Sequence, residues 1–144
     1  MKYLLAFSFL VVALTSCAQK KKQEDLDYRV TSQKFLQLIS RGEIDSAKKM
    51  FIAPDDDDDF GVNNQLVLIK RFLDDVKFIP DYDEFILDSL DLAHTKRREY
   101  TIKLYKDNQK ANPENFVGEV SIRFFDGAPK KIITISAIAK PSKL

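Results

Sequence analysis

The sequence predicts an α+β domain in which three helices precede a sheet of three or four antiparallel strands. Apolar residues recur with a helical period of 3.6 before Pro80, and the period changes to about 2 after it. Turn-forming residues separate the periodic segments on both sides of this change. Helices segregated from a meandering sheet are typical of the α+β class and not of a doubly wound α/β fold.

Three amphipathic segments predict the helices. The first is expected over residues 26–40, with Asp25 as its N-cap. The second is expected over residues 43–51, with acids at its start and lysines at its end, as the helix dipole favours. The third begins near residues 63–64 and ends at Pro80. The apolar stripes expected to reach the core are Tyr28, Phe35, Leu38 and Ile39, then Ile44, Ala47 and Phe51, then Leu66, Ile69, Phe72, Leu73 and Val76.

Alternating segments in the second half predict the strands. They span residues 85–92, 99–106, 116–125 and 131–139. Lys96 to Arg98 is interpreted as a charged turn between the first two, and residues 126–129 as a turn before the last. The last segment is apolar on both faces, with Ile132, Ile133 and Ile135 in succession. We therefore expect it in the interior of the sheet.

The N-terminus has the pattern of a secretory signal peptide. Lys2 supplies the positive start, and an apolar run from Leu4 to Leu14 is interrupted only by Ser8. A permanent membrane-spanning helix needs about 20 apolar residues, which this run does not reach. We expect residues 1–16 to be removed.

The residues Leu14-Thr15-Ser16-Cys17 resemble the bacterial lipobox. The resemblance implies that the Cys17 thiol takes a diacylglycerol, that the lipoprotein signal peptidase cuts after Ser16, and that the new amino end is available for acylation. Ala18 stands where an aspartate would retain an enterobacterial lipoprotein in the inner membrane. This favours the outer membrane, with the domain outside the cytoplasm.

The cysteine content and the net charge agree with this predicted location. Cys17 is the only cysteine, so the mature chain has no internal disulfide, and acylation explains an unpaired thiol in an exported protein. Residues 17–24 are expected to form the lipidated cysteine and a polar tether, and residues 25–144 a single domain. Loss of Lys2 lowers the 23 basic residues to 22, which equals the 22 acidic ones. A neutral domain gives no support for nucleic-acid binding.

Asp55 to Asp59 is a candidate calcium loop, because hard cations prefer carboxylate oxygens. The spacing does not fit a calcium-binding hand: with the run at its first five positions, the sixth holds Phe60 instead of glycine. The twelfth holds Leu66 instead of glutamate. The run is interpreted as a solvated loop, and no metal site is predicted.

His94 is the only histidine and the only candidate general base of that type. It would need a pocket and a partner such as Asp88 or Asp91, and its place near a strand end favours the surface. No phosphate loop, nucleophile motif or cofactor motif is present. The sequence therefore predicts no catalytic residue and no cofactor.

The stretch from Phe35 to Phe51, with Gly42-Glu43-Ile44-Asp45, Ala47 and Met50 within it, resembles the start of nuclear-transport-factor-2-like domains of the cystatin-like superfold. The resemblance implies a strongly curved sheet around helices, with an apolar pocket on the concave side. The alternative is a flatter sheet that helices cover on one face.

Three functions follow from these observations. The first is a non-enzymatic, lipid-anchored binding or accessory protein of the cell envelope, whose partner is another envelope protein or a small apolar ligand. The second is a small pocket enzyme of the isomerase, dehydratase or hydrolase class, which the resemblance implies for some family members. The third is an immunity or inhibitor lipoprotein, whose acidic loop would suit a basic target.

Overall fold

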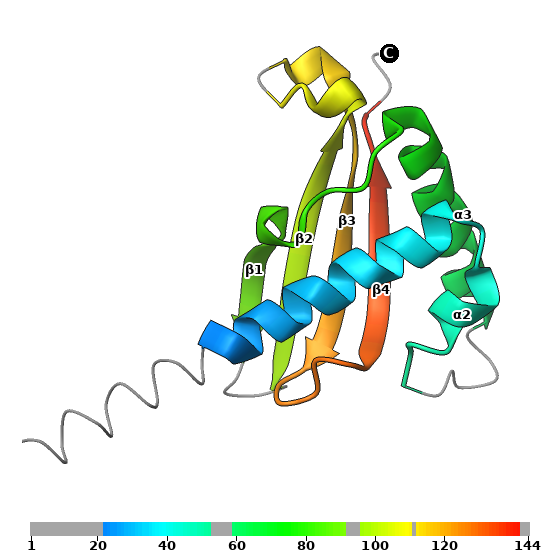
Figure 1. Cartoon of the computed structure of the whole chain (residues 1–144). Helices are drawn as coiled ribbons and strands as arrows, with labels where there is room; N and C mark the ends of the chain where they lie inside the picture. Colours follow the sequence, from blue (N-terminus) through cyan, green and yellow to red (C-terminus); the bar gives the residue numbers. More distant parts are fainter. Residues whose placement is uncertain (1–21, 53–58, 92–95, 111, 142–144) are drawn as a thin grey trace, which may run out of the picture.

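A computed structural model of the chain describes residues 22–52, 59–91, 96–110 and 112–141. The helices come first and a four-stranded antiparallel sheet follows, so the predicted α+β class and element order are confirmed (Figure 1). The main elements are a first helix (residues 22–40), α2 (Ile44–Lys48), α3 (Asp59–Val76), β1 (Ile86–Asp91), β2 (Arg97–Tyr105), β3 (Phe116–Phe125) and β4 (Ile132–Ala139). Three short 3₁₀ turns accompany them: η1 (Tyr82–Glu84), η2 (Lys106–Asn108) and η3 (Pro113–Asn115).

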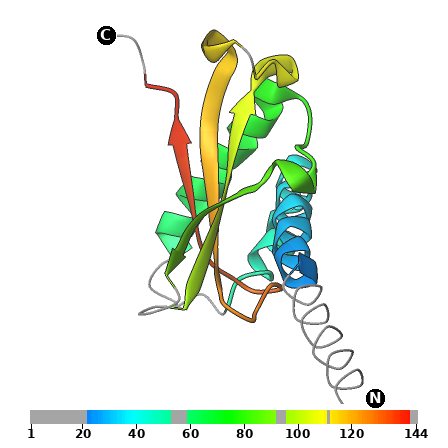
Figure 2. The same cartoon turned by 90° about the vertical axis from the view of Figure 1, so that its left-hand side faces the viewer.

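The sheet is an open meander in the order β1-β2-β3-β4. The first helix crosses one face of it, and α3 lies beside β4 (Figures 1 and 2). We call the face toward the first helix the inner face and the opposite one the outer face. The core lies between the inner face and the helices.

The first helix extends further toward the N-terminus than predicted. Asp25 is a residue of the helix and not its cap, and its side chain accepts hydrogen bonds from Arg29 of the same helix and from Tyr100 of β2. The predicted apolar stripe is confirmed, because Tyr28, Phe35 and Ile39 are fully buried and Leu38 is partly buried against the core. Gly42 follows the helix with φ +77°, a conformation that glycine adopts at little cost, and its N–H donates to the carbonyl of Ile39 at 2.9 Å.

Helix α3 begins at Asp59, about one turn before the predicted start. The last residue of the acidic run is therefore the first residue of the helix. The helix ends at Val76, before Pro80, because Lys77 takes a positive φ of 58°. The predicted stripe of this helix is confirmed, since Leu66, Ile69, Phe72, Leu73 and Val76 are all buried.

The strands alternate as the sequence predicts. Tyr100, Ile102 and Leu104 of β2 face the helices, and their register partners on β3 are Ile122, Val120 and Gly118. Both rows are buried, whereas most of the intervening residues retain exposure. The period of 2 therefore encodes which side chains enter the core.

Strand β4 contradicts the prediction that it lies in the interior of the sheet, because it forms an edge. Other groups cover this edge. The Ala137 N–H donates to the side-chain oxygen of Gln65 on α3 at 2.7 Å, and the Ile132 N–H donates to the Met50 carbonyl at 2.9 Å. Ile52 donates in turn to the Ile132 carbonyl at 2.8 Å. A helix side chain and a short parallel bridge, not another strand, therefore occupy backbone groups at the free edge of β4.

In the part of the chain that the structure describes, no helix is both long enough and apolar enough to cross a membrane.

Candidate functional site

Several residues that the sequence singles out lie outside the described residues. They are Leu14, Thr15, Ser16 and Cys17 of the lipobox, Asp55 to Asp58 of the acidic run, and His94. Asp91 ends β1, and Asp88 is exposed at an irregularity in the pairing of that strand with β2. Among the described residues, no group of three or more histidines, cysteines and acids could hold a metal ion.

A cluster of polar and aromatic residues joins the first helix to the sheet, and sequence reasoning did not find it. We call it the helix–sheet cluster, and its members are Glu24, Asp25, Tyr28, Arg29, Arg98, Tyr100 and Asp126.

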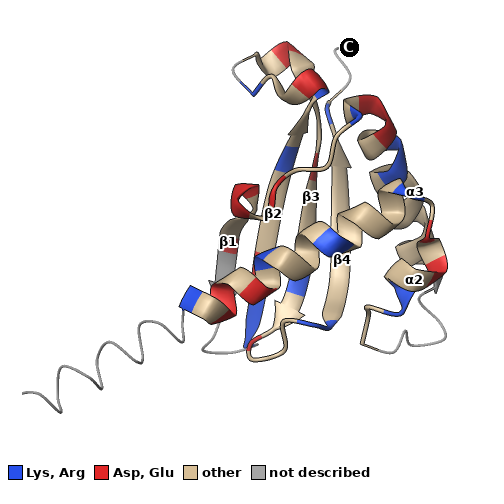
Figure 3. Cartoon of the chain, in the orientation of Figure 1, with Lys and Arg blue, Asp and Glu red and all other residues tan. Residues whose placement is uncertain are grey.

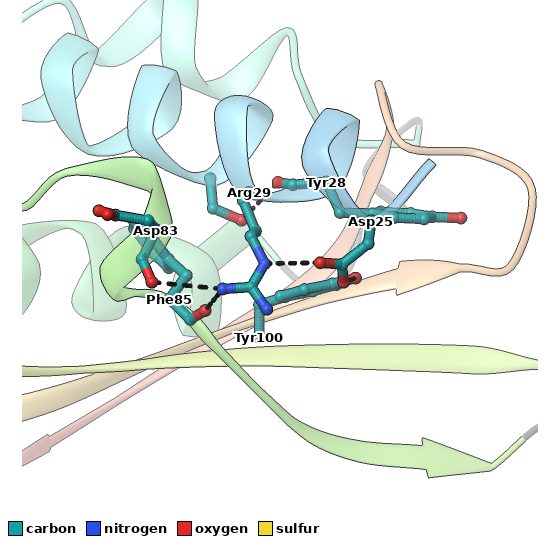
Figure 4. A network of polar contacts seen from close by, with 7 residues as sticks. Asp25, Tyr28, Arg29, Asp83, Phe85 and Tyr100 are labelled. Atoms are coloured by element: carbon teal, nitrogen blue, oxygen red, sulfur yellow. Dashed lines mark hydrogen bonds and ion pairs between the residues drawn. The ribbon is translucent and has the colours of Figure 1, made fainter. Parts of the chain in front are cut away.

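The Asp25 carboxylate forms the first half of the helix–sheet cluster (Figure 4). It accepts from Arg29 Nε at 2.8 Å and from the Tyr100 hydroxyl at 2.7 Å. The guanidinium of Arg29 also donates to the backbone carbonyls of Asp83 and Phe85. One ion pair on the helix is thereby tied both to β2 and to the segment that leads into β1.

Arg98 forms the other half of the helix–sheet cluster. Its guanidinium pairs with Glu24 at 3.4 Å and with Asp126, and it lies 5.0 Å from the centre of the Tyr28 ring. Its side chain is only 15% exposed. The interpretation of this charged segment as a turn is therefore wrong for Arg97 and Arg98, which both lie in β2. Arg98 lies beneath the first helix.

Aromatic rings fill the space beneath these ion pairs. Tyr28 stacks on Tyr100 with ring centres 5.5 Å apart and meets Phe124 edge-on at 5.2 Å. The Tyr28 hydroxyl donates to the Phe125 carbonyl at 3.0 Å. Burial raises the pKa of the Tyr100 hydroxyl, and the nearby Asp25 carboxylate raises it further, while Arg98 opposes both effects. Because its polar members bond to one another, the helix–sheet cluster stabilises the packing of the first helix on the sheet. Asp25 and Arg29 also line an open hollow of about 870 Å³ beside Tyr82.

The raised pKa of Tyr100 predicts a loss of stability at alkaline pH. The folded chain holds this proton more tightly than the unfolded chain, whose pKa is about 10. The free energy of unfolding should therefore fall as the pH rises above about 10. We expect Tyr100→Phe to make that fall shallower in urea denaturation measured from neutral pH to about pH 11. Tyr82→Phe, which removes a hydroxyl from a ring 43% exposed, is the control, and equal slopes for wild type and Tyr100→Phe would contradict the assignment.

The outer face of the sheet carries a ladder of polar pairs between β2 and β3. Glu99 pairs with Arg123, whose Nε lies 3.0 Å from the carboxylate, and Thr101 and Ser121 share a hydrogen bond of 3.0 Å. Lys103 lies 4.0 Å from Glu119. Each pair consists of register partners, so the ladder follows from the antiparallel alignment.

Exposed aliphatic side chains flank this ladder at both edges of the sheet. Ile86 of β1 is 67% exposed and Ile138 of β4 is 61% exposed. A groove of about 370 Å³ runs beside β1, with Ile86, Thr101 and Tyr105 in its wall and Glu84 paired with Lys110 beside it. A surface that combines aliphatic edges with paired charges suits contact with another polypeptide.

The chain matches no family model, no curated protein and no solved structure to which it was compared.

Proposed function

We propose that this chain is a lipid-anchored, non-enzymatic accessory protein of the bacterial cell envelope, most consistent with the outer membrane. Cys17 carries the lipid, and the domain binds a partner protein of the envelope through the outer face of its sheet.

The lipobox supports the anchor, and the extent of the first helix supports a short tether. Helical structure at Lys22 leaves residues 18–21 between the domain and Cys17. Five Cα steps reach at most about 18 Å when fully extended. A domain on such a tether stays close to the bilayer surface.

Side chains fill the space between the inner face and the helices, and this observation is the main support for a binding function. A pocket enzyme of the nuclear-transport-factor-2-like type would need a cavity between sheet and helices. In the described part of the chain, large side chains occupy this region, among them the fully buried Tyr28, Phe35, Phe85 and Phe124. The exposed outer face is the better candidate for contact with a partner. Membership of that family and a cone-shaped sheet stay predictions.

The lipid anchor is tested by Cys17→Ala. We expect the variant to lose incorporation of radiolabelled palmitate and to accumulate as unprocessed precursor, because the modified thiol directs cleavage after Ser16. Wild-type chain expressed at the same level is the control. Normal processing and membrane retention of the variant would overturn the anchor proposal.

The binding surface is tested by crosslinking in cells. A photoreactive residue replaces exposed Ser136 on the outer face, and a matched control carries it at exposed Lys34 on the first helix. We expect Ser136, but not Lys34, to yield one major adduct with an envelope protein, identified by mass spectrometry. Adducts at neither position, together with an enzymatic activity of the purified chain, would favour the pocket-enzyme alternative. A secreted toxin or hydrolase as the adduct would favour the inhibitor alternative.

A further inference from the structure

Basic side chains gather at the end of the domain from which the tether leaves. We call this surface the basic end, and it consists of Lys22, Lys96, Arg97, Lys130 and Lys131. Figure 3 shows lysines and arginines in blue at the lower end of β2 and in the turn between β3 and β4, near the start of the first helix.

Backbone contacts hold the parts of the basic end together. The Asp126 N–H donates to the carbonyl of Lys96 at 2.7 Å, and Arg97 is the register partner of Phe125. The next turn bends back through a hydrogen bond of 3.2 Å from the Lys131 N–H to the Ala128 carbonyl. Two segments from distant parts of the sequence therefore present their cations at one end of the sheet, and the ion pair of Glu24 with Arg98 holds the start of the first helix beside them.

Acidic residues at this end are partly neutralised by internal pairs. Glu24 and Asp126 both pair with Arg98, and Asp25 pairs with Arg29. Two acids share the single charge of Arg98 and Asp27 is exposed, so these groups together lower the positive excess by two charges. Asp91, the register partner of Arg97, lowers it by a third. The acidic run before α3 lies outside the described residues and is not part of this balance.

An exposed aromatic ring accompanies the charges. Phe125 is 38% exposed, and the Arg97 guanidinium lies 5.8 Å from its ring centre. Aromatic rings beside cations are favoured at the headgroup level of a bilayer, where an apolar body and a charged tip are both accommodated. The basic end thus combines electrostatic attraction to anionic lipid with a small apolar contact.

We propose that the basic end docks on the anionic phospholipid headgroups of the membrane that holds the anchor. The inference rests on the proposed lipid anchor, which keeps Lys22 within about 18 Å of Cys17. Docking turns the strands away from the bilayer, since they extend from the basic end toward the opposite end of the domain (Figure 1). The outer face then lies parallel to the membrane normal and stays accessible to an envelope partner.

The experiment uses the mature chain, residues 17–144, attached to vesicles through a maleimide lipid on its only thiol, Cys17. Chemical coupling makes the test independent of lipidation in cells. All residues of the buried core fall in the sequence between Tyr28 and Ala137, so removal of residues 1–16 leaves the core intact. Amide hydrogen exchange of residues 126–131 is compared on vesicles of phosphatidylcholine alone and of phosphatidylcholine mixed with phosphatidylglycerol.

We expect slower exchange of this turn on the anionic vesicles, and loss of most of that protection at high salt, because salt screens surface charges. A triple variant that changes Lys96, Lys130 and Lys131 to glutamine should also lose it. The matched control changes Lys34, Lys77 and Lys106, three exposed lysines outside the basic end. Lys96 and Lys77 both have positive φ, so the two variants are alike in backbone context.

Either of two results would overturn docking: equal exchange on the two kinds of vesicle, or equal loss of protection in the two triple variants. The second result would mean that net charge, and not the basic end, attracts the domain. Failure of palmitate labelling in cells would refute the anchor alone, because the coupled chain still reports on docking.

Discussion

Phe124→Ala is expected to lower the free energy of unfolding by about 3–5 kcal/mol, the cost of a large cavity in a packed core. Phe124 is fully buried on the inner face of β3. Its ring packs edge-on against Tyr28 at 5.2 Å and Tyr100 at 6.1 Å, and those rings also carry the contacts that hold the first helix. Loss of the ring removes its own burial and the support of both tyrosines.

The neighbouring residue provides the matched control. Phe125 has the same side chain but is 38% exposed, so Phe125→Ala should change stability by only about 0.5 kcal/mol. Urea denaturation followed by circular dichroism measures both variants. Similar losses in the two would show that the register of β3 is not the one described.

Gly118→Ala should destabilise the domain by about 1–3 kcal/mol through overpacking. A Cβ atom at this position would lie 2.5 Å from Phe72 Cε2 on α3 and 2.8 Å from the carbonyl oxygen of Ile138 on β4. The aromatic ring can move, but the carbonyl belongs to the neighbouring strand. The glycine therefore sets how closely α3 approaches the sheet.

Two further variants separate the effect of the close contact at Gly118 from that of backbone strain at a glycine. Phe72→Leu combined with Gly118→Ala should restore part of the loss, because the two residues share one space and their effects are coupled. Gly42→Ala meets no atom within 4 Å and strains only a positive φ. It should cost about 1 kcal/mol or less. A thermal midpoint for Gly118→Ala equal to that of wild type would contradict the close approach of Phe72.

The fold class and the order of elements were predictable because they depend on neighbours in the sequence. The change of period at Pro80 separates helices from strands, and Gly42 marks a helix end through a conformation that other residues avoid. Helix starts were less accurate. Both the first helix and α3 begin earlier than expected, because acidic residues are compatible with the first turn of a helix as well as with a cap or loop.

The helix–sheet cluster was not predictable from local pattern. Glu24 and Arg98 are 74 residues apart, and Asp25 and Tyr100 are 75 apart. A run of three cations indicates a solvated turn when it is considered alone. Only the position of Arg98 on the inner face, beneath a helix with two acids near its start, converts it into a buried partner.

The sequence by itself determined the α+β class, the order of helices and strands, and most of the residues by which the helices, β2 and β3 face the core. Those properties follow from periodicity along a single segment. Tertiary structure alone decided that β4 is an edge, that Arg98 joins the first helix to the sheet, and that one face of the sheet stays open. Each of these depends on which segments meet in space, and burial of an apolar residue does not reveal whether a strand or a helix covers it.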